Sequence, residues 1–193
     1  MRPIETPRLC LRPWRSSDVE DMFAYSADPL VGPAAGWACH ESIEESRQVI
    51  ARFIASREVL AVALRESGRV VGSIGLHARV LDARLAGRPQ RELGFVLSRG
   101  CWGLGYMPEA ARAVIRQGFE EMGLVLIACG HYEGNFRSRR VIEKCGFQYA
   151  FPKIVVRELL DGKETIEHVF FLTRERYLER KNAAEDKAEA PPC

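Results

Sequence analysis

The sequence predicts a single domain of the α/β class, an α+β arrangement in which a mixed β-sheet is flanked by helices. Segments with the period of a strand alternate along the chain with segments that have the period of a helix. Residues 124–130 form a nearly continuous apolar run, which is typical of a strand covered on both faces. A glycine-rich loop at 98–105, the glycine loop, joins a strand at 91–97 to a helix whose apolar positions extend from Ala111 to Met122. A chain of 193 residues can bury a real core as one domain.

The N-terminal part begins with a strand at 9–14, which a proline closes. Ser17 and Glu20 have the spacing of a capping box, so a short helix should follow them. Residues 28–37 contain too many prolines and glycines for regular structure. A second capping box then predicts a helix over 42–56.

Two hairpins are predicted by their turn residues. The Ser-Gly pair at 67–68 joins strands that extend over 58–80, and the Asp-Gly pair at 161–162 joins strands over 154–172. Both pairs tolerate the positive φ angles that tight hairpin turns require. A polar, arginine-rich connection at 81–90 leads from the first hairpin to the next strand.

The glycine loop is a candidate anion site. Pro108 fits the first turn of the helix that follows, and Glu109 favours the positive end of its dipole. Such a junction offers free backbone N–H groups, and its glycines let an anion approach the backbone closely. The loop lacks the Gly-Lys-Ser/Thr of a nucleotide-binding P-loop and reverses the glycine order of the dinucleotide pattern. It therefore predicts a phosphate site of another kind, with a tight turn as the alternative.

The C-terminal part carries one more helix signal before the second hairpin. Asn135 suits an N-cap, Lys144 suits the last turn, and Gly146 suits the position after the helix. Beyond Arg176 the chain lacks a sustained apolar stripe and should fray after a short helix. We therefore expect a domain over 1–178 and a flexible tail over 179–193.

Composition excludes several classes of function. A formal net charge of +2 implies neither nucleic acid nor membrane binding. The six cysteines include no Cys-x-x-Cys pair and no zinc spacing, so we expect buried thiols in a reducing cytoplasm and no metal. No apolar run has transmembrane length. The expected protein is cytoplasmic, a monomer or a homodimer.

Two motifs about thirty residues apart carry a family resemblance. The first is Trp-Gly-x-Gly-Tyr-x-x-Glu-Ala from Trp102, and the second is Asn-x-x-Ser-x-x-x-Ile-Glu-Lys-x-Gly-Phe from Asn135. With the opening Thr-Pro-Arg-Leu-x-Leu-Arg from Thr6, the chain resembles the GNAT superfamily of acyl-CoA-dependent N-acetyltransferases, most of all its ribosomal-protein-alanine acetyltransferase-like (RimJ/RimL-like) branch. The resemblance spans roughly residues 5–178. It implies a sheet whose fourth and fifth strands splay apart and admit acyl-CoA.

The resemblance implies a set of residues that bind acetyl-CoA. Backbone N–H groups of the loop and helix start would bind the diphosphate, the strand before them would pair with the pantetheine amides, and Asn135 would contact the pantetheine arm. Arg99 is a further candidate for a phosphate contact. Trp102 could instead be core packing, Arg99 a solvated side chain, and Asn135 a simple N-cap. The candidates are Leu97, Arg99, Trp102, Gly103, Leu104, Gly105, Tyr106, Met107 and Asn135.

Acetyl transfer also requires that the acceptor amine lose a proton. Glu92 lies on the strand at 91–97, where this branch often carries glutamate, and is the first candidate for the base. It could instead pair with an arginine such as Arg91 across the sheet. His77 and His131 are less favoured. A lysine amine is harder to deprotonate than an α-amine by about 3.3 kcal/mol, so a weak base suffices for an N-terminal acceptor.

The departing thiolate requires a hydrogen-bond donor. Many GNAT enzymes use a tyrosine seven positions after the motif asparagine, but that position is Ile142 here. In the RimJ/RimL-like branch the proposed substitute is the serine three residues after the asparagine, which is Ser138. That serine could instead bond its own helix backbone. Tyr132 is the second candidate.

The acceptor is the least determined feature. After Gly146-Phe147 the branch usually continues with a glutamate-glycine pair, which this chain replaces with Gln148-Tyr149, so its acceptor could differ. Arginines in the linking segments favour a peptide N-terminus or an acceptor with a carboxylate. A polyamine or an aminoglycoside is the alternative, and a non-catalytic acyl-CoA-binding module is the rival from another class. No cysteine adjoins an activating base at the motif, so direct transfer is expected.

Overall fold

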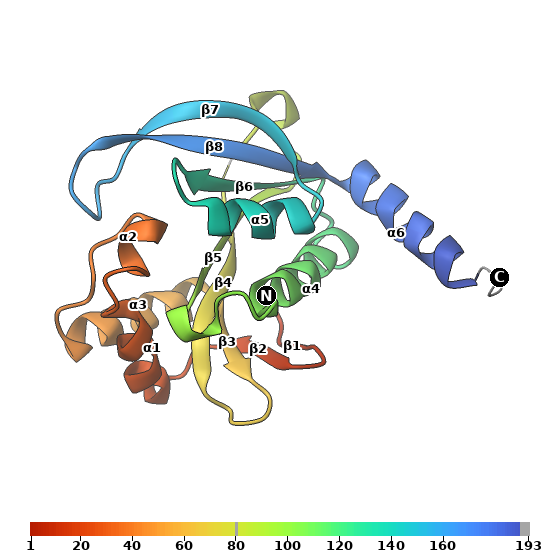
Figure 1. Cartoon of the computed structure of the whole chain (residues 1–193). Helices are drawn as coiled ribbons and strands as arrows, with labels where there is room; N and C mark the ends of the chain where they lie inside the picture. Colours follow the sequence, from red (N-terminus) through yellow and green to blue (C-terminus); the bar gives the residue numbers. More distant parts are fainter. Residues whose placement is uncertain (80, 190–193) are drawn as a thin grey trace.

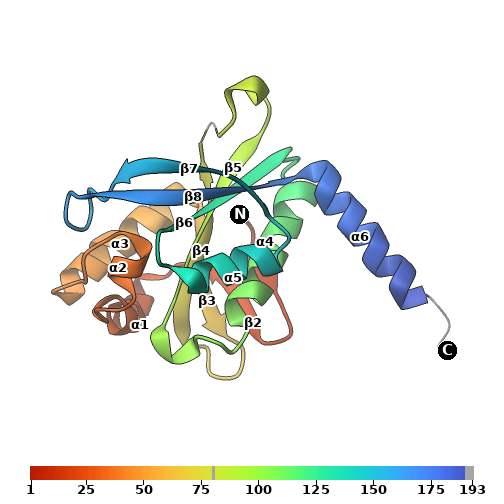
Figure 2. The same cartoon turned by 45° about the horizontal axis from the view of Figure 1, so that its top comes forward.

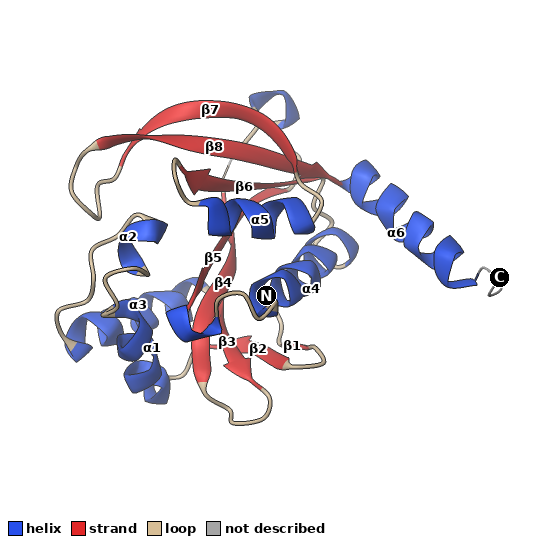
Figure 3. Cartoon of the chain, in the orientation of Figure 1, coloured by secondary structure: helices blue, strands red, loops and turns tan. Residues whose placement is uncertain are grey.

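The computed structural model describes residues 1–79 and 81–189, which form an eight-stranded sheet with helices on both faces (Figures 1 and 3). The strand order is β1-β2-β3-β4-β5-β6-β8-β7. Among the described strands, β5 and β6 alone pair in parallel and the other neighbours are antiparallel, so the predicted mixed sheet is confirmed. The strands are β1 Ile4–Glu5, β2 Leu9–Pro13, β3 Val59–Leu64, β4 Val70–Ala78, β5 Gln90–Leu97, β6 Leu126–Tyr132, β7 Gln148–Val156 and β8 Glu164–Thr173.

The α-helices are α1 Val19–Ser26, α2 Gly32–Ala35, α3 Ile43–Ser56, α4 Tyr106–Glu120, α5 Phe136–Lys144 and α6 Arg174–Glu189. Short 3₁₀ turns cover Ser16–Asp18, Ala83–Leu85 and Arg99–Cys101. Helices α1 and α3 pack over one face of the sheet, α4 and α5 lie side by side over the other, and α6 projects away from the domain (Figures 1 and 2).

Strand β3 shows why the sheet is covered on both faces. Its sequence is apolar throughout, and successive side chains of a strand point to opposite faces. Leu60 and Val62 join the core under α4, whereas Ala61 and Ala63 join the core under α1 and α3. Both cores are therefore built from one strand.

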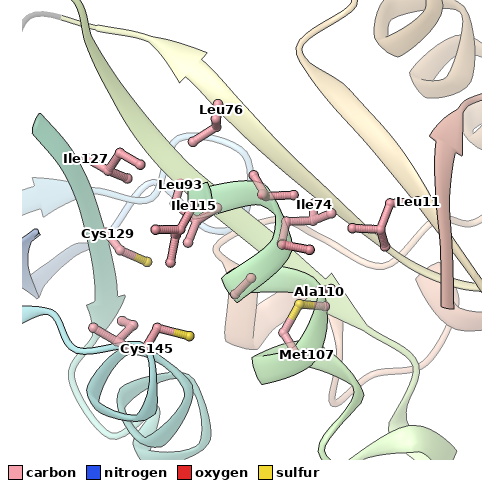
Figure 4. Packing of buried hydrophobic residues seen from close by; sticks show 14 of the residues in the cluster. Leu11, Ile74, Leu76, Leu93, Met107, Ala110, Ile115, Ile127, Cys129 and Cys145 are labelled. Atoms are coloured by element: carbon pink, nitrogen blue, oxygen red, sulfur yellow. The ribbon is translucent and has the colours of Figure 1, made fainter. Parts of the chain in front are cut away.

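Helix α4 is anchored by the larger core (Figure 4). Met107 and Ala110 in its first turns face Ile74 and Leu11 of the sheet, and Ile115 lies near Leu93. All of these side chains are nearly or fully buried. This packing holds the N-terminus of α4 at a constant place beside β5.

The splay predicted between the fourth and fifth strands lies between β5 and β6, because the two-residue strand β1 is not among the predicted strands. These strands pair only where residues 90–92 meet residues 126–128, and beyond Glu92 the ladder ends. The other edge of β5 remains paired with β4 as far as Leu97. The second half of β5 therefore faces an opening on the side of β6.

Most predicted elements are confirmed within a few residues, but the first strand of the second hairpin, predicted over 154–160, lies at Gln148–Val156. The hairpin glycines Gly68 and Gly162 have φ values of 72° and 66°, and the hydroxyl of Ser42 caps α3 by accepting from the N–H of Glu45. Val80, at the end of the strand predicted to reach that residue, lies outside the described residues. The boundary predicted at residue 178 stays a prediction, although α6 crosses it and is longer than the short helix expected there.

The first capping box is wrong. Asp18, not Ser17, organises the start of α1: its carboxylate accepts from the guanidinium of Arg12 on β2 and from the N–H of Arg15, all at 2.8 Å. Although burial works in the opposite direction, the hydrogen bonds from Arg12 and Arg15 lower the pKa of Asp18. Because this tertiary ion pair holds the turn at 16–18, the helix begins at Val19 and Glu20 lies inside it.

The expectation that 28–37 lacks regular structure is also wrong. Residues Gly32–Ala35 form the one-turn helix α2, which ends at Gly36 with a φ of 89°. The glycine that reads as a breaker in the sequence is the C-cap of this turn, with Pro33 in its first positions.

Candidate functional site

A cavity of about 540 Å³ occupies the opening between β5 and β6. The second half of β5 forms one wall, and the glycine loop with the first turn of α4 closes one end. Helix α5 and the end of β6 form the opposite wall, and α2 adds a third side. A ligand of elongated shape could therefore lie along β5 with one end at the start of α4.

The glycine loop leaves its backbone accessible. Gly103 and Gly105 both have a φ of 79°, a left-handed conformation that favours glycine. A Cβ added to Gly103 would have no atom within 4 Å, so the space beside it is open. Gly105 caps α4, and the N–H groups of the first turn, those of Tyr106 and Met107, have no acceptor within the helix. This end of the cavity is suited to an anion.

Arg8 and Glu109 hold the glycine loop in place. The Arg8 side chain donates to Glu109 Oε2 at 2.7 Å and to the carbonyl of Leu104 at 2.9 Å, and its guanidinium lies 4.6 Å above the ring of Tyr106. Glu109 Oε1 accepts from the Thr6 hydroxyl at 2.7 Å and from the Arg8 N–H at 2.9 Å. The N-terminal segment and α4 are thus joined directly at the loop.

Glu109→Gln should weaken CoA binding severalfold and lower the free energy of unfolding at neutral pH by about 1–2 kcal/mol, because the amide loses the charge that Arg8 pairs with. Calorimetry and urea unfolding measure the two effects. The matched control is Glu121→Gln at the other end of α4, which loses an exposed ion pair with Arg2 and should keep full CoA affinity.

The stability effect of Glu109 should depend on pH. Burial tends to raise the pKa of its carboxyl, but hydrogen bonds from Thr6 and Arg8 outweigh burial and hold the pKa below the ordinary 4.5. A carboxyl with a lowered folded-state pKa stabilises the fold above its unfolded-state pKa and loses that contribution as the pH falls through the folded-state value. The stability gap between the wild type and Glu109→Gln should therefore be full at neutral pH and close in acid. A gap of constant size down to acid pH would contradict this role.

A family profile described as an acetyltransferase (GNAT) domain matches residues 8–148 of the chain. The chain belongs to the GNAT acetyltransferase family. A relative in Bacillus subtilis, the uncharacterized N-acetyltransferase YoaA, is 30% identical over 150 residues, which cover 75% of this chain and 82% of YoaA.

Solved structures share the GNAT fold. A GNAT-family acetyltransferase from Bacillus anthracis superposes with a TM-score of 0.79 at 24% identity, covering 90% of this chain and 99% of that one. The microcin C7 self-immunity acetyltransferase MccE, solved with acetyl-CoA and AMP, superposes with a TM-score of 0.73 at 13% identity, covering 87% and 93%. In the part of this chain that the structure describes, no cluster of His, Cys, Asp and Glu could hold a metal ion, and no helix is long and apolar enough to cross a membrane.

Most of the residues predicted to bind acetyl-CoA line the cavity between β5 and β6. They are Leu97, Trp102, Gly103, Gly105, Tyr106, Met107 and Asn135. Arg99 and Leu104 are not among the described residues that line it. Arg99 is exposed, and the side chain of Leu104 is directed outward with 54% of the residue exposed. The phosphate contact of Arg99 and the backbone contact of Leu104 stay predictions.

Trp102 and Asn135 each make contacts that stabilise the fold and also line the cavity. The indole of Trp102 donates to the carbonyl of Leu97 at 2.8 Å, packs against the smaller core and also lines the cavity. Asn135 accepts from the N–H of Ser138 at 3.1 Å and donates to the carbonyl of Ala34 at 2.8 Å. Both polar atoms of the Asn135 side chain are thus engaged within the protein, and its contact with a ligand stays a prediction.

All three predicted catalytic residues, Glu92, Tyr132 and Ser138, line the cavity. Glu92 forms an ion pair of 2.8 Å with Arg79, whereas the guanidinium of Arg91 donates to a backbone carbonyl. The Glu92 side chain keeps 20% of its surface exposed. The Glu92 carboxylate is therefore paired with Arg79 and is also accessible from the cavity.

The surroundings of Tyr132 further favour the neutral form of its phenol. Burial, followed by the charges of Glu167 and Glu92, raises the pKa of its phenol. Its ring packs against Gly36, where an added Cβ would lie 2.6 Å from the hydroxyl. The segment expected to be irregular thus forms the wall behind a candidate proton donor.

His131 and His77, the less favoured candidates for the base, lie in different places relative to the cavity. His131 is buried, lines the cavity and makes a 2.9 Å hydrogen bond from Nδ1 to the Tyr132 carbonyl. His77 lies 3.7 Å from Glu58 and is not among the described residues that line the cavity.

Sequence reasoning missed two sets of cavity residues. Arg137, Arg140 and Lys144 of α5 line it, and their spacing of three and four residues, which places them on one helix face, could have revealed them. Glu167 of β8 also lines it, and no local pattern marks it.

The thiols near the site are poor nucleophiles. Cys129 lines the cavity, and burial raises the pKa of its thiol well above 9.0. Burial likewise raises the pKa of Cys145 to about 11. Because a thiolate is the nucleophilic form, both side chains remain unreactive at neutral pH.

Proposed function

We propose that the chain transfers the acetyl group of acetyl-CoA directly to a primary amine. The observation that carries this proposal is the cavity between β5 and β6, which has an end suited to an anion at α4 and three candidate proton-transfer groups along its walls. The resemblance to the RimJ/RimL-like branch adds the acceptor class, a protein or peptide N-terminal α-amine or an amino-acid-like amine.

The residues present fit acetyl-CoA. The open space beside Gly103 and the free N–H groups at the start of α4 suit a diphosphate. Arg137, which stacks on Trp102 at 4.6 Å, and Arg140 add positive charge on the facing helix. The unpaired edge of β5 offers backbone partners to the pantetheine amides. Bound acetyl-CoA supplies a thioester as the acetyl source.

Each proton in the transfer has a candidate group. Glu92 accepts a proton from the ammonium form of the amine before the nitrogen attacks the thioester carbon, and the second proton that the nitrogen loses passes to the departing thiolate. Ser138 donates a hydrogen bond to the sulfur as the carbon–sulfur bond breaks, with Tyr132 as the second candidate donor. The raised pKa of the Cys129 thiol, caused mainly by burial, favours this direct route over an acetylated thiol.

Glu92→Gln should lower kcat strongly at neutral pH and less at high pH, where the amine deprotonates without help. Initial rates of CoA release across a pH series measure this. The matched variant is Arg79→Gln, which removes the ion-pair partner but leaves the carboxylate in the cavity and should retain most activity. An equal loss for Glu92→Gln at every pH would assign Glu92 a structural role.

CoA release with a panel of N-terminal peptides, amino acids, polyamines and aminoglycosides tests the proposed function as a whole. Release with any primary amine, together with an acetylated product of the expected mass, supports an acetyltransferase. CoA binding without release from any amine would instead identify an acyl-CoA-binding module.

A further inference from the structure

The Glu167 side chain lies over Gly130, which has no side chain of its own, and both residues line the cavity. Strands β6 and β8 are antiparallel, with Tyr132 opposite Glu167 and Gly130 opposite Val169. The Glu167 carboxylate folds back over Gly130 so closely that a Cβ there would lie 2.2 Å from Oε1. A glycine at position 130 is therefore what allows the carboxylate to lie where it does.

The two carboxylate oxygens of Glu167 have different surroundings. Lys153 of β7 holds Oε2 through an ion pair of 2.9 Å. Oε1 is the atom that lies nearest to Gly130, and the residue lines the cavity. The side chain is only 15% exposed, so the lysine both orients it and balances its charge.

Glu167 lies at the point where the sheet opens. Ala128 is the last residue of β6 that pairs with β5, and its partner is Glu92. Gly130, with Glu167 above it, follows two residues later. Glu92 and Glu167 both act on Tyr132, whose phenol has a raised pKa because of burial and then of these two charges. The end of the cavity near Tyr132 therefore holds two carboxylates, each paired with a basic side chain, Arg79 and Lys153.

The opposite wall of the same cavity is basic, since Arg137, Arg140 and Lys144 line it from α5. A phosphate-bearing ligand suits that wall, which leaves the two carboxylates for a group that donates charge-assisted hydrogen bonds to them. A protonated amine is such a group.

We propose that Glu167 binds the acceptor amine in its ammonium form and thereby selects amines that carry no carboxylate on the adjacent carbon. This inference rests on the proposed acetyltransferase function. Oε1 accepts a hydrogen bond from the ammonium, Lys153 holds Oε2, and Glu92 takes the proton before transfer. A free amino acid would place its carboxylate beside two glutamates, whereas a peptide N-terminus or an amino-acid amide would not.

The sharpest test compares acceptors that differ only in this group, such as alanine amide and alanine. The wild type should prefer the amide by about tenfold or more in kcat/KM. Glu167→Gln should raise the KM for alanine amide about tenfold and leave the KM for acetyl-CoA unchanged. It should also reduce the ratio of kcat/KM for alanine amide to that for alanine. Glu164→Gln, on the exposed part of β8, is the matched control and should behave as the wild type.

Gly130→Ala provides a second variant that keeps every charge. The added methyl displaces the end of a flexible side chain rather than backbone, so the sheet should fold normally. If the position of the carboxylate matters, Gly130→Ala should raise the acceptor KM as Glu167→Gln does. Unchanged acceptor KM and preference in Glu167→Gln would overturn the inference while leaving the acetyltransferase function intact.

A binding measurement keeps the test independent of turnover. Propylammonium titrated into the CoA-bound protein should shift the amide resonance of Gly130 in the wild type, and much less in Glu167→Gln. This result would support binding of an ammonium by Glu167 even if no amine in the panel released CoA. The lack of CoA release would count only against the proposed acetyltransferase function. Equal shifts in both proteins, or none in the wild type, would overturn it.

Discussion

Gly105→Val is expected to weaken CoA binding by well over tenfold while the domain remains folded. Gly105 precedes the first turn of α4 and has a φ of 79°. A Cβ added to Gly105 would lie 3.4 Å from Nη2 of Arg8. A branched side chain there would crowd the Arg8 guanidinium that holds the glycine loop and strain the left-handed backbone that presents the N–H groups. Isothermal calorimetry with CoA measures the affinity, and circular dichroism checks the fold.

Backbone strain alone must be separated from loss of the binding surface. Gly68, in the hairpin between β3 and β4, has a φ of 72° and open space around it. Gly68→Val therefore carries a similar strain outside the cavity and should lose stability but not CoA affinity. If Gly105→Val bound CoA as tightly as Gly68→Val does, the glycine loop would not be the phosphate site.

Ser138→Ala is expected to lower kcat by about tenfold to a thousandfold with little change in the KM for acetyl-CoA. A hydrogen bond to the departing sulfur matters mainly in the transition state, so its loss affects turnover rather than binding. The thiol of CoA is a fair leaving group, which leaves some activity in the variant. Steady-state kinetics with a saturating acceptor measures both constants.

The alternative interpretation of Ser138 predicts the opposite result. If the residue serves only the first turn of α5, alanine is the better helix former and turnover should be intact. Tyr132→Phe is the matched variant, because the phenol of Tyr132 lines the same cavity and remains protonated. Full activity in Ser138→Ala together with a loss in Tyr132→Phe would assign the donor role to Tyr132.

Local patterns account for much of the fold. The apolar run before Gly130 predicts a buried strand, and β6 is one, because the strand's own side chains specify burial on both faces. The glycines of the glycine loop and the cap at Asn135 are likewise local, since φ preferences and N-cap hydrogen bonds involve residues close in sequence. Most of the predicted cofactor residues belong to this class.

An ion pair between a strand and the turn that follows it overrides a local signal near the N-terminus. Ser17 and Glu20 have the right spacing for a capping box, yet Asp18 organises the turn because Arg12 of β2 binds it. Nothing within the helix sequence encodes that partner. A charged tertiary hydrogen bond outweighs a local cap when the two compete.

The sequence by itself determined the order of the elements, the glycine loop at the start of α4 and the family motifs, because each depends on residues near one another in the chain. Only the tertiary structure decided that Arg8 clamps Glu109 and that Glu167 lies over Gly130. The first contact joins residues about a hundred positions apart, and the second depends on the register of β6 against β8. Strand register and ion pairing across the fold are set by how the whole chain packs, which no local pattern contains.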